Sequence, residues 1–200
     1  MTRAPAVHAA TSSEVATSKE GGDDLGLLMV GYQGGDAQAF RALFDRIRGP
    51  LRGYVLSLVR DRGRADDLVQ ETLLQLHRSR HTYLPPRPVL PWVLGIARHV
   101  VLMDRRAAGR RSKLLDEHIE LPTELPMPTG DLDLSDRDAL RRALGRVSED
   151  QREVVLLHHF WGFSFAEIGQ ILGIRAGAAK VRSHRGIARL RTLLGVKGDG

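Results

Sequence analysis

Residues 164–190 read SFAEIGQILGIRAGAAKVRSHRGIARL, and this stretch contains the start and stop signals of two short helices. Ser164 followed three positions later by Glu167 is the pattern of a capping box, in which both residues satisfy backbone donors at a helix start. Gly173 is expected to end that helix, because glycine adopts the left-handed C-cap conformation without steric cost. A second helix should begin near Ala176. Two helices joined by a tight glycine turn are typical of a helix-turn-helix.

The second helix of this pair is strongly basic. Its basic side chains include Lys180, Arg182, His184, Arg185 and Arg189. In a helix-turn-helix the second helix enters the major groove of DNA, where Lys and Arg contact guanine edges and phosphates. The pattern therefore favours DNA binding. The alternative at this point is an ordinary helical hairpin whose basic face is simply hydrated.

The composition fits a small helical protein with an anionic partner. The chain has 200 residues, of which 42% are hydrophobic but only 5% aromatic. This length corresponds to one or two domains, and the low aromatic content favours small helical modules over a β-sandwich or barrel. Lys and Arg number 30 against 24 Asp and Glu, for a net charge of +6. That balance points to nucleic acid or another anionic surface.

Several absent features narrow the function. Cysteine is absent, which excludes a disulfide framework, a thiolate metal site and a thiol redox switch. There is no apolar run of the ~18 residues that a membrane span needs. Residues 1–22 lack the apolar core of a signal peptide and are interpreted as a disordered tail. We expect the chain to stay in the cytoplasm.

Helical periodicity over residues 23–113 predicts a first helical module. Within it, residues 65–80 read ADDLVQETLLQLHRSR and predict one helix with an apolar inward face. Its outward positions include Asp67, Gln70 and Glu71. A polar strip on an otherwise buried helix indicates a surface that is either hydrated or bound by a partner.

Prolines divide this first module. Pro50 is expected to end or kink one helix, and four prolines between Pro85 and Pro91 predict a loop before a helix that opens at Trp92. The end of that helix carries Arg105, Arg106, Arg110, Arg111 and Lys113. Compensation of the helix dipole needs only one or two such charges, so the cluster also indicates a phosphate partner. Trp92 itself is interpreted as a core residue, with base stacking as the alternative.

An acidic segment follows, over residues 114–136. It contains seven acids, no Lys or Arg, and three prolines, and is typical of a flexible linker. A second helical module is predicted over residues 137–195, with residues 196–200 as a short tail. Ser148 and Gln151 predict another capping box at a helix start.

An enzymatic function has little support in the sequence. Asp66, Asp67 and Glu71 resemble a carboxylate cluster, but Asp66 is rotated away from the face that the other two share. His158 and His159 are adjacent and point in different directions on a helix, so we interpret them as packing residues rather than joint metal ligands. No phosphate loop, nucleophile elbow or zinc spacing is present. We therefore expect no catalytic site, no metal and no cofactor.

Three motifs together resemble a known family, the extracytoplasmic-function (ECF) sigma factors of bacterial RNA polymerase, which keep only sigma regions 2 and 4. Residues 66–72, DDLVQET, are similar to the family's region 2.2. Residues 92–98, WVLGIAR, are similar to the start of regions 2.3 and 2.4, and residues 151–180 resemble region 4. The resemblance covers residues 23–194. It implies an all-α fold of a region 2 helical bundle and a region 4 helix-turn-helix, joined by the flexible acidic linker.

By this resemblance the chain would bind core RNA polymerase and direct it to promoters with −10 and −35 elements. The resemblance implies that Asp67, Gln70 and Glu71 contact the β′ clamp helices and that region 4 meets the β flap. It assigns the −10 element to Arg98, His99, Arg105, Arg106, Arg110 and Arg111. It assigns the −35 element to Lys180, Arg182, His184, Arg185 and Arg189. An anti-sigma factor, which in this family is often membrane-bound, is a further implied partner, and no small-molecule substrate is implied.

The chain departs from the family pattern at a few positions. His99 stands where Asn is common, Met103 precedes Asp104 where an Asp is frequent at position 103, and Val181 stands where Ser is frequent. The promoter sequence therefore does not follow from the resemblance. Two alternatives stay open: a stand-alone helix-turn-helix regulator that binds duplex DNA as a dimer, and a nucleic-acid-processing enzyme.

Overall fold

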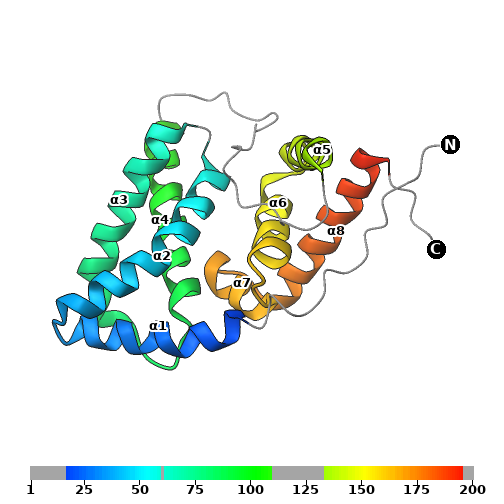
Figure 1. Ribbon diagram of the computed structural model, residues 1–200. Coiled ribbons are helices and arrows are strands. Elements are labelled where there is room, and N and C mark those ends of the chain that lie inside the picture. The colour runs from blue at the N-terminus through cyan, green and yellow to red at the C-terminus, as the bar shows by residue number, and fades with distance from the viewer. Residues whose placement is uncertain (1–16, 60, 110–132, 196–200) are drawn as a thin grey trace.

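The computed structural model of the chain describes residues 17–59, 61–109 and 133–195. Within these residues the secondary structure is helical with no strand, which confirms the all-α prediction. The first module comprises α1 (Thr17–Gln33), α2 (Ala37–Leu58), α3 (Arg62–Ser79) and α4 (Val89–Gly109). The second module comprises α5 (Leu134–Gly145), α6 (Glu149–Val155), α7 (Phe165–Leu172) and α8 (Ala176–Leu194) (Figure 1). In the described part of the chain, none of the helices is both long enough and apolar enough to cross a membrane.

The turn between α1 and α2 follows from its sequence. Gly35 has a φ of 90°, a left-handed conformation that favours glycine. Asp36 then caps α2, because its carboxylate accepts hydrogen bonds from the backbone N–H groups of Gln38 and Ala39 at 2.7 and 3.2 Å. Gly35 and Asp36 together account for the turn and for the start of α2.

Two predicted boundaries in this module differ from the structure. α1 begins at Thr17 and not at Asp23. α2 continues through Pro50 to Leu58, so the helix does not end at this proline, which was one of the two outcomes expected there. Proline removes one backbone hydrogen bond from a helix. Ile47 and Leu51, on either side of it, are fully buried, and their burial holds the helix together through the defect.

α4 also begins earlier than predicted, at Val89. Pro91 therefore lies in the first turn of the helix and not in the preceding loop. The first turn tolerates proline because its N–H groups have no intrahelical acceptor. Trp92 is consequently the fourth residue of α4 instead of its first.

The loop before α4 is fastened to α1. The side-chain amide of Gln33 donates hydrogen bonds to the carbonyls of Arg80 and Tyr83, at 2.7 and 2.9 Å. The phenol of Tyr83 in turn donates to the carbonyl of Arg87 at 2.6 Å. Hydrogen bonds thus hold the proline-rich connection near both of its ends.

The second module begins within the range predicted as linker. α5 starts at Leu134, and the carboxylate of Asp133 accepts a hydrogen bond from the N–H of Asp136 as its cap. The end of the predicted linker (114–136) is therefore helical. The remaining linker residues, 114–132, lie outside the described residues, as do the tails over 1–16 and 196–200.

The capping box predicted at Ser148 and Gln151 is not formed. The Ser148 carbonyl accepts from the N–H of Gln151 and from that of Arg152, so α6 does start there. The Ser148 hydroxyl, however, makes no capping hydrogen bond. Glu149 and Asp150 in the first turn supply the negative charge that favours a helix start.

The predicted helix-turn-helix is confirmed. Ser164 and Glu167 form the reciprocal capping box at the start of α7, and Gly173 ends that helix with a φ of 68°. Gly169 lets the turn approach closely, because a Cβ there would lie 2.7 Å from the carbonyl oxygen of Ile174. α8 then begins at Ala176, where the sequence predicted it.

The two modules pack against each other. One apolar core joins buried residues of the first module, such as Tyr54 and Leu94, with Leu157, Ile168 and Ile171 of the second. α7 packs against α4 across this boundary (Figure 1). A separate small core around Leu144, Leu156 and Leu190 lies inside the second module. The two modules are therefore packed together, and this arrangement is called closed below.

Candidate functional site

α8 presents its basic residues on the face opposite to its packing face. The buried positions of the helix are Ala179, Ser183, Gly186 and Leu190. Lys180, His184, Arg185 and Arg189 are exposed, and Arg182 is half-buried. The five residues predicted to bind DNA therefore lie on the outer side of the second helix of the helix-turn-helix, where a nucleic acid can reach them.

Close packing of α8 on α6 fixes this face. At Gly186 a Cβ would lie 2.7 Å from a methyl carbon of Val155 and 3.3 Å from the carbonyl oxygen of Gln151. Only glycine fits such an approach. The glycine thus lets α8 lie directly on α6 and orients the basic residues on its other side.

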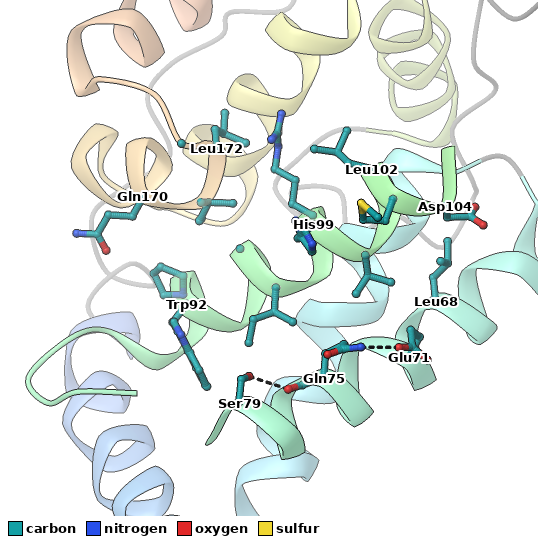
Figure 2. A pocket seen from close by; sticks show the side chains of 18 of the residues that line it. Leu68, Glu71, Gln75, Ser79, Trp92, His99, Leu102, Asp104, Gln170 and Leu172 are labelled. Atoms are coloured by element: carbon teal, nitrogen blue, oxygen red, sulfur yellow. Dashed lines mark hydrogen bonds between the residues drawn. The ribbon is translucent and has the colours of Figure 1, made fainter. Parts of the chain in front are cut away.

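The polar strip of α3 is accessible, as predicted. Asp67 and Gln70 are exposed, and Glu71 is half-buried. The carboxylate of Glu71 accepts a hydrogen bond from the side-chain amide of Gln75 at 2.8 Å (Figure 2). Asp67 pairs with Arg64 one turn earlier at 3.5 Å. The strip is a partly organised acidic surface on the solvent side of α3, whose other side is buried.

A groove of about 1290 Å³ runs between α3, α4 and α7. Figure 2 shows Glu71 of α3, Trp92 and His99 of α4 and Gln170 of α7 around the same hollow. Asp67 and Arg98 also line it. The groove therefore brings together residues that the sequence assigned to two different partners, and one wall of it belongs to the second module.

Trp92 is neither a fully buried core residue nor a fully exposed one. Its side chain is half-buried, and its ring centroid is 5.4 Å from that of Tyr83 in a tilted arrangement. One part of the indole thus packs on the first module, and another part lines the groove.

The basic residues of α4 are differently placed from those of α8. His99 and Arg106 are exposed. Arg98 and Arg105, in contrast, are both engaged by acids of the second module. The Nε of Arg98 donates to Glu153 at 3.2 Å, and the guanidinium of Arg105 donates to Glu149 and to the carbonyl of Leu58. Arg110 and Arg111 lie outside the described residues.

Glu153 lies at the boundary between the modules, and no sequence pattern identified it. Its side chain is buried, and its Oε1 accepts hydrogen bonds from the Tyr54 phenol at 2.6 Å and from Arg98. Burial raises the pKa of Glu153, while Arg98 and the Tyr54 hydrogen bond act against that shift. Burial and the neighbouring carboxylate raise the pKa of Tyr54 well above its ordinary range. In the sequence, Glu153 is only a single acid before an apolar run, and this pattern does not indicate which residues it contacts.

A third acid of α6 contacts α8. The carboxylate of Asp150 lies 3.2 Å from the guanidinium of Arg182, one of the five predicted DNA-binding residues of that helix. Both side chains are partly exposed, so the pair contributes less than about 1 kcal/mol to stability. Its main effect is to orient Arg182.

His158 packs as predicted, whereas His159 is exposed. His158 stacks on Phe165 with 4.1 Å between ring centroids, and its Nδ1 lies 2.8 Å from the carbonyl oxygen of Phe163. The ring of His159 is turned 75° from that of His158 and lies near Ser183. Over the described ranges, no group of three or more His, Asp or Glu residues could hold a metal ion.

The carboxylates that resembled a cluster in the sequence diverge. Asp66 accepts a hydrogen bond from Arg52 of α2 at 2.9 Å, on a different side of α3 from Asp67 and Glu71. The three acids therefore do not converge on one point, and they have separate roles.

Comparison with known protein families matches both modules. Residues 43–111 match the family model of sigma-70 region 2, and residues 137–190 match that of sigma-70 region 4. The RNA polymerase sigma factor CarQ of Myxococcus xanthus is 36% identical over 170 residues, which cover 84% of this chain and 95% of CarQ. The ECF RNA polymerase sigma factor SigL of Mycobacterium tuberculosis is 31% identical over 165 residues, covering 82% of this chain and 93% of SigL.

Solved structures give the same result. The sigma factor RpoE of Bartonella quintana, in its complex with the anti-sigma factor NepR, superposes with a TM-score of 0.67 at 28% identity. That match covers 81% of this chain and 100% of RpoE. CnrH, in its complex with the cytosolic domain of CnrY, superposes with a TM-score of 0.62 at 23% identity, covering 86% and 97% of the two chains. The CnrH match is evidence for the fold alone.

Proposed function

This chain belongs to the ECF sigma factors of bacterial RNA polymerase, and from that membership we propose how its surfaces divide the work of a sigma factor. As an RNA polymerase sigma factor, it binds core polymerase, directs promoter-specific initiation of transcription and catalyses no reaction itself. The first module is region 2 and the second module is region 4. The observation that carries the assignment is that both regions are present and that each presents the expected charged surface.

In region 4, α8 is the helix that reads the −35 element. Support comes from the outward placement of Lys180, His184, Arg185 and Arg189 on the helix that follows the Gly173 turn. Side chains in this position reach base edges and phosphates of the major groove. Arg182 joins them at the edge of the face, oriented by Asp150.

In region 2, the strip formed by Asp67, Gln70 and Glu71 binds the β′ clamp helices of the polymerase. The exposure of the first two side chains and the hydrogen bond that orients Glu71 support this role. Acidic side chains on a rigid helix offer a specific docking surface to a basic partner. The β flap is the corresponding polymerase contact of region 4.

The −10 element falls to α4. Arg98, His99, Arg105 and Arg106 are the assigned residues in the described part of this helix, and Arg110 and Arg111 extend the assignment beyond it. Opened DNA is held by basic grooves with aromatic side chains nearby. The half-buried Trp92 and the groove that His99 lines are consistent with that chemistry.

An anti-sigma factor is the proposed regulator. The related RpoE of Bartonella quintana was solved with one such protein, NepR. The closed arrangement of regions 2 and 4 leaves both regions within reach of a single partner. We place the chain in the cytoplasm, where polymerase and promoter DNA are found.

The test is co-purification with core RNA polymerase followed by run-off transcription. Wild type is compared with Asp67→Ala/Gln70→Ala/Glu71→Ala and with the matched control Asp24→Ala/Gln38→Ala/Asp45→Ala, which removes the same charge from α1 and α2. We expect wild type and the control to join the polymerase and start transcripts, and the strip variant to do neither. Tight duplex binding by a wild-type chain that ignores the polymerase would replace the proposal with the stand-alone regulator.

A further inference from the structure

The first turns of α6 contain three acids that all contact arginines assigned to DNA. Glu149 and Glu153, whose arginine partners lie on α4, are named here the acidic turn. Glu149 pairs with Arg105, Glu153 with Arg98 and Asp150 with Arg182. The first two arginines belong to region 2, whereas the acids belong to region 4.

Helix geometry explains why two of these acids meet α4 together. Glu149 and Glu153 are four positions apart on α6 and therefore share one face, while Asp150 is turned toward α8. Arg98 and Arg105 are seven positions apart on α4, which is two helical turns and again one face. Two carboxylates on one helix thus face two guanidiniums on the other.

The pairs are built into the boundary between the regions. Glu153 is buried and also accepts from Tyr54, whose ring meets that of Trp161 edge-on with 6.1 Å between centroids. Arg105 donates at the same time to the carbonyl of Leu58, at the end of α2. A DNA phosphate that approaches either arginine would have to replace a carboxylate that is already in place.

Carboxylate and phosphate oxygens are equivalent partners for a guanidinium, since both are anionic acceptors that accept charge-assisted hydrogen bonds. Glu153 occupies the Nε of Arg98, and Glu149 and the Leu58 carbonyl occupy both Nη atoms of Arg105. Each carboxylate also neutralises the charge of its arginine, so a phosphate has to compete with it for that guanidinium.

We propose that the acidic turn is an internal competitor of DNA: Glu149 and Glu153 occupy Arg98 and Arg105 in the closed chain and keep region 2 from holding an opened strand. The proposal rests on the −10 role given to these arginines above. Separation of region 4 from region 2 removes both acids at once and exposes both arginines. Region 2 then becomes competent for DNA only in molecules whose regions have parted.

The test uses the full chain and a fluorescently labelled single-stranded oligodeoxynucleotide of mixed sequence, with binding measured by anisotropy. Glu149→Ala/Glu153→Ala removes both competitors. Glu153 accepts hydrogen bonds from Tyr54 and Arg98, which both belong to region 2. Replacing Glu153 therefore removes hydrogen bonds between the regions and leaves those within region 4 in place. We expect affinity to rise about tenfold, as for a protein whose competent state was rare.

The matched control is Asp136→Ala/Asp138→Ala, which changes the net charge equally but removes acids of α5, where Asp138 pairs with Arg141 of the same helix. It should leave DNA affinity unchanged within about twofold, since distant exposed charges are screened by salt. Arg98→Ala/Arg105→Ala, added to the acid variant, should abolish the gain. An equal gain in the control, or a gain that survives the loss of both arginines, overturns the proposal.

Glu149→Ala alone keeps the test decisive if the double variant unfolds. Its ion pair is partly exposed, so its removal leaves the fold intact and should raise DNA affinity about twofold to fivefold. No rise overturns the proposal. Run-off transcription by wild type with core polymerase distinguishes failure of the proposed function from failure of the competition. If wild type starts no transcripts, the proposed function is wrong. If wild type starts transcripts but the acid variants bind DNA no more tightly, only the competition is wrong.

Discussion

The phenol of Tyr54 donates a 2.6 Å hydrogen bond to the carboxylate of Glu153, which lies 99 residues further along the chain. Tyr54 belongs to α2 in region 2, and Glu153 belongs to α6 in region 4. Both side chains are buried. The bond is therefore a polar contact inside the apolar boundary between the two regions. Removing it should weaken the contact between them.

Tyr54→Phe should loosen the closed arrangement. The substitution removes one of the two donors of a buried carboxylate, which costs about 1–3 kcal/mol. The measurement is energy transfer between dyes on Leu74→Cys and Ala188→Cys, one in each region, which is possible because the natural chain has no cysteine. Energy transfer should fall in Tyr54→Phe.

The control for that experiment is Tyr83→Phe. It also removes a buried phenol hydrogen bond, but the acceptor is the carbonyl of Arg87 within region 2. Energy transfer should stay at the wild-type level. If Tyr54→Phe matches this control, the two regions are not held together through Glu153.

The closed arrangement should respond to pH through Glu153. Burial raises the pKa of Glu153 in the closed chain, so closing takes up a proton within the window between its ordinary and raised values. The stabilisation is complete below the ordinary pKa and is lost as the pH rises through the raised one. Arg98 and Tyr54 contact this carboxylate, and Glu149 and Arg105 lie alongside.

Glu153→Gln isolates this response. The amide keeps an oxygen that accepts from Tyr54 and Arg98 but carries no charge and does not titrate. Energy transfer in this variant should be independent of pH across the window, and at neutral pH the regions should remain as closed as in wild type or more so. Opening of Glu153→Gln at neutral pH would show that attraction to Arg98 outweighs the cost of burial.

Gly186→Ala should destabilise region 4. The added Cβ would lie 2.7 Å from a Val155 methyl carbon, and overpacking of this kind costs about 1–3 kcal/mol. Gly177→Ala is the control in the same helix, since nothing lies within 4 Å of its Cβ position. That change should leave stability unchanged or raise it by up to about 1 kcal/mol, because Gly177 lies in the first turn of α8. Denaturant unfolding measures both, and equal effects would contradict the close packing of α8 on α6.

Ser164→Ala should weaken the helix-turn-helix, and Ser148→Ala should not. The Ser164 hydroxyl caps α7, and loss of such a cap costs about 0.5–2 kcal/mol. The Ser148 hydroxyl makes no cap bond, so its removal should change the free energy of unfolding by less than about 0.5 kcal/mol. The comparison is made by denaturant unfolding, and a larger loss at Ser148 would restore the capping box predicted there.

Local signals in the sequence were sufficient for the helix-turn-helix and for the α3 strip. Ser164, Glu167 and Gly173 act within one or two turns of the chain, so their effects follow from the residues themselves. The exposure of Asp67 and Gln70 likewise follows from helical periodicity. These parts of the fold were predicted correctly.

Other local signals were overruled by tertiary packing. Pro50 does not end α2, because its neighbours are buried. Ser148 and Gln151 carry the capping pattern without its hydrogen bond, which shows that the pattern permits the bond but does not enforce it. The helix starts at Thr17 and Leu134 could not be predicted from hydrophobic periodicity, because few apolar residues lie near them.

The closed arrangement could not be predicted from sequence patterns. Tyr54, Arg98 and Glu153 are far apart in the sequence, and no periodicity connects them. The basic residues Arg98 and Arg105 were predicted as a DNA surface, and the structure shows both engaged by acids of region 4. The residue types were thus informative about chemistry, whereas their present partners depend on long-range packing.

On the competition proposed above, the buried carboxylate at the boundary between the regions would also raise the amount of sigma factor that promoter use requires. If only a fraction of molecules is open, the apparent affinity for any ligand that needs the open form falls by that fraction. An open population of about 1% would weaken that affinity about a hundredfold. A small rise in the amount of this sigma factor would then start little transcription, and the cell would tolerate a reserve of it without misdirecting its polymerase.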